Sequence, residues 1–216
     1  FMLLPKPKYQ RQRQSGGLQL IKTFHTALAN KKLLWIYLVA FLIMGSFVAV
    51  FNFISYVLLA PPYSLSQTVV GLLFVVYLFG TFSSTYMGRL SDQHGNGRVL
   101  ILGLLIMLTG GLLTLLQTLV FKFIGLAIFT FGMLGSHSVA CGWGGKLNQG
   151  DKAQSSSMYM FFYYAGASSL GTLGGVFLES YGWSGVIGMV AAAVIICLLV
   201  VVRLELSVSQ HLLWHH

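Results

Sequence analysis

The chain contains six apolar runs that carry no Lys, Arg, Asp or Glu. Each run is long enough to cross a hydrocarbon core of roughly 30 Å as an α-helix. In lipid the backbone must satisfy its own hydrogen bonds, and the alternating pattern of barrel strands is not seen in these runs. We therefore predict an all-α integral membrane protein with six transmembrane helices, at Leu33–Leu59, Val69–Met87, Val99–Val120, Phe123–Ala140, Met158–Leu178 and Trp183–Val202.

Charge is scarce and unevenly placed. Only 8% of the 216 residues are charged, whereas a soluble domain carries about 25%. Twelve of the thirteen Lys and Arg lie before the first span, in the second and fourth loops, or after the last span, and Lys122 alone lies on the other side. The positive-inside rule then predicts that both termini are cytoplasmic, in a bacterial inner membrane. Because topology accounts for the net charge of +9, no nucleic-acid partner is predicted.

The predicted organisation has three parts. Residues 1–32 form a basic cytoplasmic linker, residues 33–203 the six-helix bundle, and residues 204–216 a cytoplasmic tail. Within the linker, Leu18 and Ile21 begin a helical spacing of apolar residues, which favours an amphipathic helix on the membrane surface. The alternative is a linker without regular structure.

A short motif occurs twice in the chain. Gly88-x-x-x-Asp92-x-x-Gly95 recurs eighty-seven residues later as Gly175-x-x-x-Glu179-x-x-Gly182, each time between two apolar runs. The two copies fall on opposite sides of the predicted membrane. We therefore predict two inverted three-helix repeats, at residues 33–120 and 123–202, which is a plan typical of secondary transporters. Chance recurrence of Gly and an acid in short loops is the alternative.

The first copy of this motif resembles the loop motif of the major facilitator superfamily, Gly-x-Leu-x-Asp-x-x-Gly followed by basic residues. The loop departs from the family pattern at Gln93, where a cation is usual. The motif positions that it keeps are Gly88, Leu90, Asp92, Gly95 and Arg98. The resemblance covers roughly residues 30–203. It implies that the chain corresponds to the C-terminal half, helices seven to twelve, of a transporter of the drug:proton antiporter type.

The resemblance also implies a conformational gate in this loop. Asp92 is expected to cap a neighbouring helix or to pair with Arg89 or Arg98, and so to hold one state of the transporter. The alternative is a solvated turn residue. The candidate gate residues are Gly88, Arg89, Asp92, Gly95 and Arg98.

Polar groups within membrane spans are costly against lipid, so they are expected to face protein or a water-filled cavity. Aromatic rings with single polar tips suit amphipathic organic molecules. The candidate substrate-binding residues are Asn52, Tyr56, Tyr77, Thr81, His137, Tyr163 and Tyr164. The alternative for each is a hydrogen bond between neighbouring helices. His137 is also a candidate proton carrier.

Small residues recur on the fifth span. Such residues let helices approach closely, and a gating hinge is the more specific hypothesis. The candidate packing positions are Ser168, Gly171, Gly174 and Gly175.

These observations predict one half of a secondary active transporter that exports small organic or drug-like molecules by alternating access. Its expected partners are the lipid bilayer, a small-molecule substrate, protons, and either an N-terminal six-helix half or a second copy. No carboxylate lies within the spans, so a proton-coupling acid is expected in the other half. The alternative is a non-transporting membrane fragment or assembly subunit that needs a separate N-terminal half.

Enzymatic activity, a cofactor and a metal site are not predicted. Gly182-Trp-Ser-Gly185 is similar to the Gly-x-Ser-Gly of rhomboid intramembrane proteases, but those enzymes need a histidine on a later membrane helix. The later histidines here, beginning at His211, follow the last predicted span.

Overall fold

Long helices make up most of residues 30–148 and 152–213, the part of the chain that the computed structural model describes. Within these ranges no β-strand occurs. The helices are α2 (Lys31–Leu59), α3 (Gln67–Gly71), α4 (Val76–His94), α5 (Asn96–Leu113), α6 (Leu119–Leu147) and α7 (Lys152–Leu213), with a 3₁₀ helix η1 (Leu72–Val75). The surface helix predicted around Leu18 lies outside the described residues.

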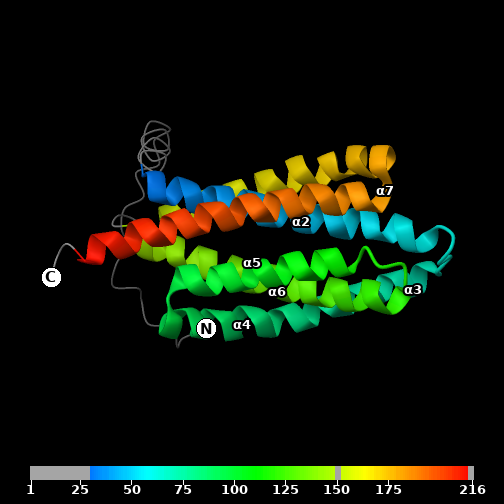
Figure 1. Cartoon of the computed structure of the whole chain (residues 1–216), viewed down its shortest axis with the longest axis horizontal. Coiled ribbons are helices and arrows are strands. Elements are labelled where there is room, and N and C mark those ends of the chain that lie inside the picture. Colours follow the sequence, from blue (N-terminus) through cyan, green and yellow to red (C-terminus); the bar gives the residue numbers. More distant parts are fainter. Residues whose placement is uncertain (1–29, 149–151, 214–216) are drawn as a thin grey trace, which may run out of the picture.

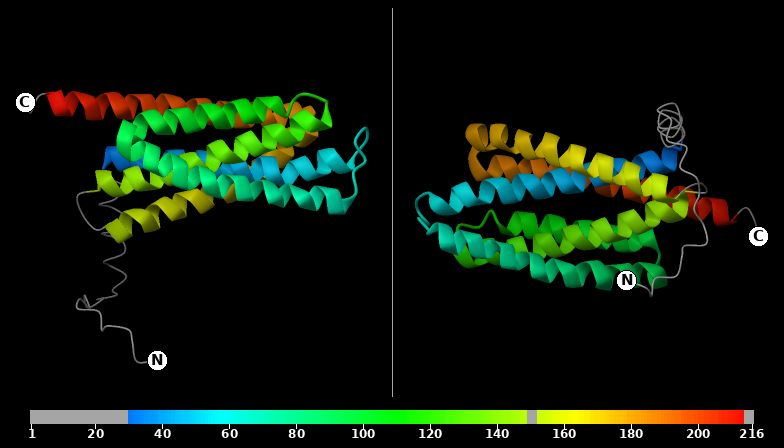
Figure 2. Two further views of the ribbon diagram at one scale, coloured as in Figure 1. Left: turned by 90° about the horizontal axis from the view of Figure 1, so that it is seen from below. Right: turned by 180° about the vertical axis from the view of Figure 1, so that it is seen from behind.

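Five helical segments in the described residues are long and apolar enough to cross a membrane. The predicted fifth and sixth spans are both contained in α7, which changes direction at Gly182 (φ 63°, ψ −158°). Figures 1 and 2 show the chain folding back there, so that the first arm (152–181) and the second arm (183–213) run in opposite directions. The six predicted spans therefore correspond to five continuous helical segments, because α7 contributes two antiparallel arms on either side of Gly182.

Several helix ends differ from the ends of the predicted spans. The second span is not one helix, because η1 separates α3 from α4. The third span ends at Leu113, and Val120 belongs to α6, so the break between the predicted repeats lies at residues 114–118. The residues from Leu204 to Leu213, predicted to be part of a tail, continue α7.

The bundle has three layers, which the left view of Figure 2 shows edge-on. α5 and the second arm of α7 form one outer layer, and α4 and the first arm form the other. α2 and α6 lie between them. α2 is accordingly the most buried helix: 67% of its most apolar stretch is buried, against 27% for the α3–α4 segment. The middle layer thus supplies about half of the buried apolar side chains, including Ile36, Ile43 and Phe129.

The fold gathers the cations at one end. The start of α2, the α4–α5 turn, the end of α6 and the end of α7 lie together in Figure 1. Their cations are Lys31, Lys32, Arg89, Arg98, Lys146 and Arg203. Lys122, at the start of α6, lies at the opposite end. We call these the cation-rich end and the Lys122 end.

Candidate functional site

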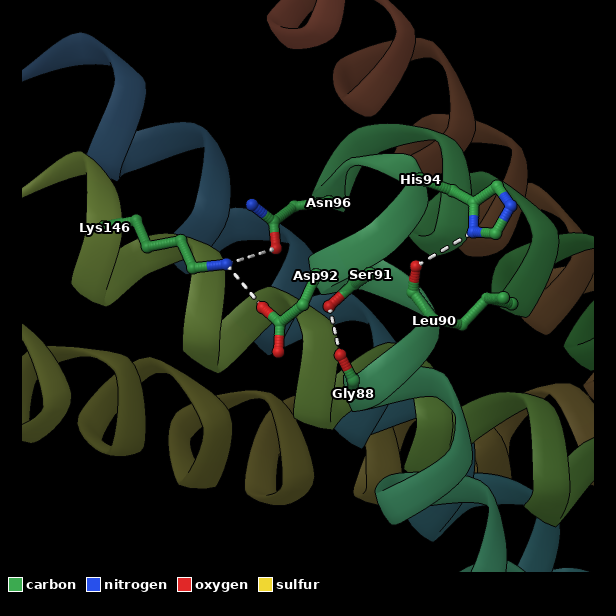
Figure 3. Close-up of polar contacts among 7 residues, drawn as sticks. All are labelled: Gly88, Leu90, Ser91, Asp92, His94, Asn96 and Lys146. Atoms are coloured by element: carbon green, nitrogen blue, oxygen red, sulfur yellow. Dashed lines mark hydrogen bonds and ion pairs between the residues drawn. The ribbon is translucent and has the colours of Figure 1, made fainter.

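The motif residue Asp92 forms an ion pair with Lys146 on α6. The Lys146 Nζ donates to Asp92 Oδ1 at 2.9 Å and to Asn96 Oδ1 at 3.3 Å (Figure 3). One lysine thereby ties α6 to both sides of the α4–α5 turn. The structure gives Asp92 a different partner from the Arg89 or Arg98 expected from the sequence; both arginines are exposed.

The turn itself consists of one residue between two helices. α4 ends at His94 and α5 begins at Asn96, and Gly95 between them has φ 93°. Gly88 lies inside α4 and makes no turn, and its nearest neighbour across the helix interface is the Ser138 hydroxyl. The carbonyl of Gly88 accepts a hydrogen bond from the Ser91 hydroxyl at 2.7 Å (Figure 3). Of the two motif glycines, Gly95 is therefore the one that the turn requires.

Two of the predicted substrate residues meet between α6 and α7. The rings of His137 and Tyr163 have centroids 4.6 Å apart. His137 Nδ1 also lies 3.0 Å from the hydroxyl of Tyr159, which is fully buried. This His137–Tyr163 cluster is half-buried and has an aromatic wall with one imidazole and two phenol groups.

Tyr77 belongs to a second aromatic cluster, between α4 and α2. Its ring centroid lies 5.3 Å from those of Phe47 and Phe51. Phe47 in turn stacks on Phe129 of α6. The two clusters together contain aromatic side chains from α2, α4, α6 and the first arm of α7.

The other predicted substrate residues are exposed. Asn52 and Tyr56 lie on α2, Thr81 on α4 and Tyr164 on α7. The Thr81 hydroxyl donates to the Tyr77 carbonyl of its own helix at 3.4 Å. Within the described residues, none of these four side chains makes a hydrogen bond to another helix. The alternative role, a hydrogen bond between neighbouring helices, is therefore not observed for them.

The two outer layers expose different chemistry. The α5 layer exposes mainly aliphatic side chains, Leu102, Leu105, Leu112, Ile195, Ile196, Leu199 and Val202. Its exposed Thr109 donates to the Leu105 carbonyl at 2.9 Å. The α4 layer also exposes hydroxyl groups, those of Thr81, Thr85, Tyr86, Tyr164, Ser168 and Thr172. Aliphatic surface suits lipid, whereas hydroxyl-rich surface within a membrane suits protein or water.

Comparison with known proteins decides the family. The family model described as Major Facilitator Superfamily matches residues 33–212. The chain belongs to the major facilitator superfamily. Superfamily proteins are transporters and not enzymes, so the protease-like motif around Ser184 does not indicate a catalytic serine. The Ser184 hydroxyl donates to the Tyr181 carbonyl at 2.9 Å.

Three relatives show how much of a superfamily protein is present. The uncharacterized MFS-type transporter YybF of Bacillus subtilis is 42% identical over 200 residues, which are 92% of this chain and 49% of the relative. The inner membrane transport protein YnfM of Escherichia coli is 41% identical over 94% of this chain and 49% of its own length. An uncharacterized transporter of Buchnera aphidicola from Schizaphis graminum is 36% identical over 87% and 45%. The chain spans about half the length of these relatives.

The predicted packing glycines of this superfamily chain contact α2. A Cβ added to Gly171 would lie 2.7 Å from Val48, and one on Gly174 would lie 2.9 Å from Phe53. Gly175 also lies against Phe53. Ser168, by contrast, is exposed, and its carbonyl accepts from the Thr172 hydroxyl.

Sequence reasoning missed three contributors. Tyr159 stands one helical turn before Tyr163 and could have been found from that spacing. Lys146 is far from Asp92 in the sequence, and no local signal pairs them. A Cβ added to Gly166 would lie closer to the backbone of Phe41 on α2 than a Cβ added to Gly171, Gly174 or Gly175 would lie to its nearest neighbour.

The Lys122 end contains a second connected cluster. Lys122 is 3% exposed, and its Nζ donates to the Thr114 carbonyl at 2.8 Å. The Trp183 indole donates to the same carbonyl at 3.2 Å, and Lys122 lies over the rings of Trp183 and Tyr63. The Tyr63 hydroxyl donates to the Gln117 carbonyl. These contacts join the loop after α2, the turn after α5 and the bend in α7.

Proposed function

We propose that this chain forms one half of a secondary active transporter that exports small organic molecules. The observation that carries the proposal is the outer face of the α4 layer, which exposes hydroxyl groups beside apolar side chains such as Phe82 and Phe161. It lies on a chain whose opposite outer face is aliphatic. A face of this kind needs protein or water against it, and alternating access needs a second bundle around a shared path.

The substrate path is proposed to run along this face. Tyr77 and the His137–Tyr163 cluster provide aromatic walls with single polar tips, and the exposed Asn52 and Tyr164 flank them. Such walls suit amphipathic organic molecules, which stack on rings and accept or donate one or two hydrogen bonds. The resemblance of the loop motif to drug:proton antiporters supports export as the direction and protons as the coupled ion.

The Asp92–Lys146 pair is proposed to belong to the gate. It connects the α4–α5 turn to α6, so a movement of either helix at the cation-rich end changes this contact. Gly88 and Gly95 are proposed to shape this part of the gate, and Arg89 and Arg98 to contact the other half of the transporter, since both arginines are exposed and form no ion pair within the described residues.

The orientation follows from charge. The cation-rich end is proposed to be cytoplasmic, with the ends of α2 and α7 on that side. The name of the Escherichia coli relative supports a bacterial inner membrane.

A second candidate function is a membrane subunit that transports nothing until it is joined by a separate N-terminal half. It is favoured by the coverage of the relatives, of which the chain spans about half. A second copy of the chain is the other possible source of the missing bundle.

One reconstitution separates these functions. The chain is placed in proteoliposomes alone and together with the N-terminal half of the Bacillus subtilis relative, and ethidium movement is followed under an imposed pH gradient. Flux by the chain alone supports a dimer, and flux only with the added half supports the subunit.

Tyr77→Ala and Tyr163→Ala should each slow flux by about tenfold, the effect of losing roughly 1.4 kcal/mol of binding. The matched control is Leu102→Ala on the aliphatic face. Absence of ethidium flux in both preparations would contradict the export proposal.

A further inference from the structure

A groove lies at the cation-rich end, between the start of α2 and the second arm of α7. Its volume is about 480 Å³. Lys31, Lys32 and Arg203 line it beside Trp35, Ile196 and Leu199. The groove is separate from the proposed substrate face, because it opens beside the second arm, in the α5 layer, and not beside α4.

The polar part of the groove attracts anions. α2 begins at Lys31 and has no acid in its first turn, so its positive helix end adds to the charge of the two lysines. Two cations at a helix start are unfavourable unless a negative group lies nearby. In residues 30–148 and 152–213 no carboxylate pairs with Lys31, Lys32 or Arg203. Glu205, the acid closest to Arg203 along the chain, has its carboxylate against Gly97 on α5.

The apolar part continues from the cations into the membrane. Arg203 and Ile196 are seven positions apart on one helix, which corresponds to about 10 Å along its axis. Leu199 between them is 62% exposed, and Ile196 is 46% exposed. Trp35 lies one turn beyond Lys31, at a depth where tryptophan marks the membrane interface. The groove therefore has cations at its opening and apolar side chains along its inner wall. The apolar wall is about as long as the part of an acyl chain nearest the headgroup.

We propose that this groove binds an anionic phospholipid, with its phosphate between Lys31, Lys32 and Arg203 and an acyl chain along Ile196 and Leu199. Basic pockets between membrane helices recognise phosphate headgroups in this way. The segment before α2 is a poor occupant, because residues 1–29 contain five Lys and Arg and no Asp or Glu. A second copy is also disfavoured, since a two-fold contact would bring the same three cations together.

Quenching of Trp35 fluorescence by brominated lipid measures which lipid occupies the groove. The full chain is placed in phosphatidylcholine nanodiscs that contain a small share of brominated phosphatidylglycerol, and the same share of brominated phosphatidylcholine is used for comparison. The difference between the protein and Trp35→Phe isolates quenching of Trp35. We expect brominated phosphatidylglycerol to be enriched at Trp35 by about fivefold or more, because one basic side chain near an anionic headgroup contributes roughly that factor.

Two variants test the parts of the groove separately. Lys32→Gln combined with Arg203→Gln should remove most of this enrichment, leaving brominated phosphatidylglycerol enriched at Trp35 by less than about twofold. The matched control is Arg89→Gln combined with Arg98→Gln, which removes the same charge from the same end and should change it less than about twofold. Leu199→Phe enlarges the side chain on the apolar wall without altering charge or adding a tryptophan, and it should also lower enrichment. Because Leu199 is largely exposed, this variant is expected to fold.

Four results would overturn the proposal. One is equal quenching by the two brominated lipids, and another is an equal loss in the groove and control double variants. The third is displacement of the lipid by millimolar inorganic phosphate, which would assign the groove to a free anion. A Trp35 emission that depends on protein concentration in lipid-free detergent would assign it to a second copy and also count against the lipid.

Discussion

Gly95 and Gly182 stand at equivalent positions of the repeated motif, and both have positive φ, at 93° and 63°. Gly95 separates α4 from α5, and Gly182 separates the two arms of α7. An added Cβ would meet no atom within 4 Å at either glycine. The requirement for glycine is therefore conformational, because this region of backbone space is strained for residues with a side chain. The repeat seen in the sequence thus corresponds to a repeated turn geometry.

The first prediction concerns these turns. Gly95→Ala and Gly182→Ala should each lower the free energy of unfolding by about 1–3 kcal/mol, the cost of a side chain in this conformation. Gly142→Ala is the control, because Gly142 is helical and also has open space around it. It should be neutral or stabilising by up to about 1 kcal/mol. Thermal unfolding in detergent, followed by circular dichroism, measures all three, and equal effects would refute the conformational explanation.

The second prediction concerns the contact between α2 and the first arm of α7. A Cβ on Gly166 would clash with the carbonyl of Phe41, which as helical backbone cannot move aside. Gly166→Ala should therefore destabilise the protein by about 1–3 kcal/mol, the usual cost of overpacking. Gly188→Ala, on the same helix with nothing nearby, should not destabilise it. Similar melting temperatures for the two variants would show that α7 shifts freely on α2.

The third prediction concerns the buried cation. Lys122→Met keeps most of the side-chain volume but loses the bond to Thr114 and the contacts with the Tyr63 and Trp183 rings. We expect a net loss of about 2 kcal/mol, because the lost cation–π contacts and charged hydrogen bond are partly offset by no longer burying a charge. Lys146→Met removes an exposed lysine as the control. Trp183 emission should report loosening at the Lys122 end first.

The fourth prediction concerns the gate pair. Asp92 and Lys146 have side chains that are 70% and 54% exposed, so their coupling should contribute less than about 1 kcal/mol to stability. A double-mutant cycle with Asp92→Asn and Lys146→Gln measures the coupling by thermal unfolding. If the pair holds one transport state, each variant should change ethidium flux far more than stability. A coupling well above 1 kcal/mol would instead indicate a structural role.

Much of the fold was predictable because hydropathy measures the cost of placing each side chain in lipid. That cost located the runs that became α2 and α6 and the two arms of α7. It failed at residues 114–118, a turn that lies inside the predicted third span. The Thr114 carbonyl there accepts from Lys122 and Trp183, so contacts from other parts of the chain, which hydropathy does not register, hold this turn.

The candidate site was predictable only in part. Tyr77, His137 and Tyr163 were found as polar residues in apolar runs, and two of them meet in one cluster. Their companions were not found, because a contact between helices depends on how each helix is rotated and crossed. Asp92 therefore has Lys146 as its partner, and no reading of its own loop indicates this.

The sequence by itself determined the membrane class, the family motif, the segregation of cations and the glycines at two turns. These are properties of single residues or short segments, and each has a cost that does not depend on distant contacts. Only the tertiary structure decided the three layers, the polar and aliphatic faces and the groove between α2 and α7. These arise where helices distant in the sequence pack together, and packing depends on the shapes of both partners.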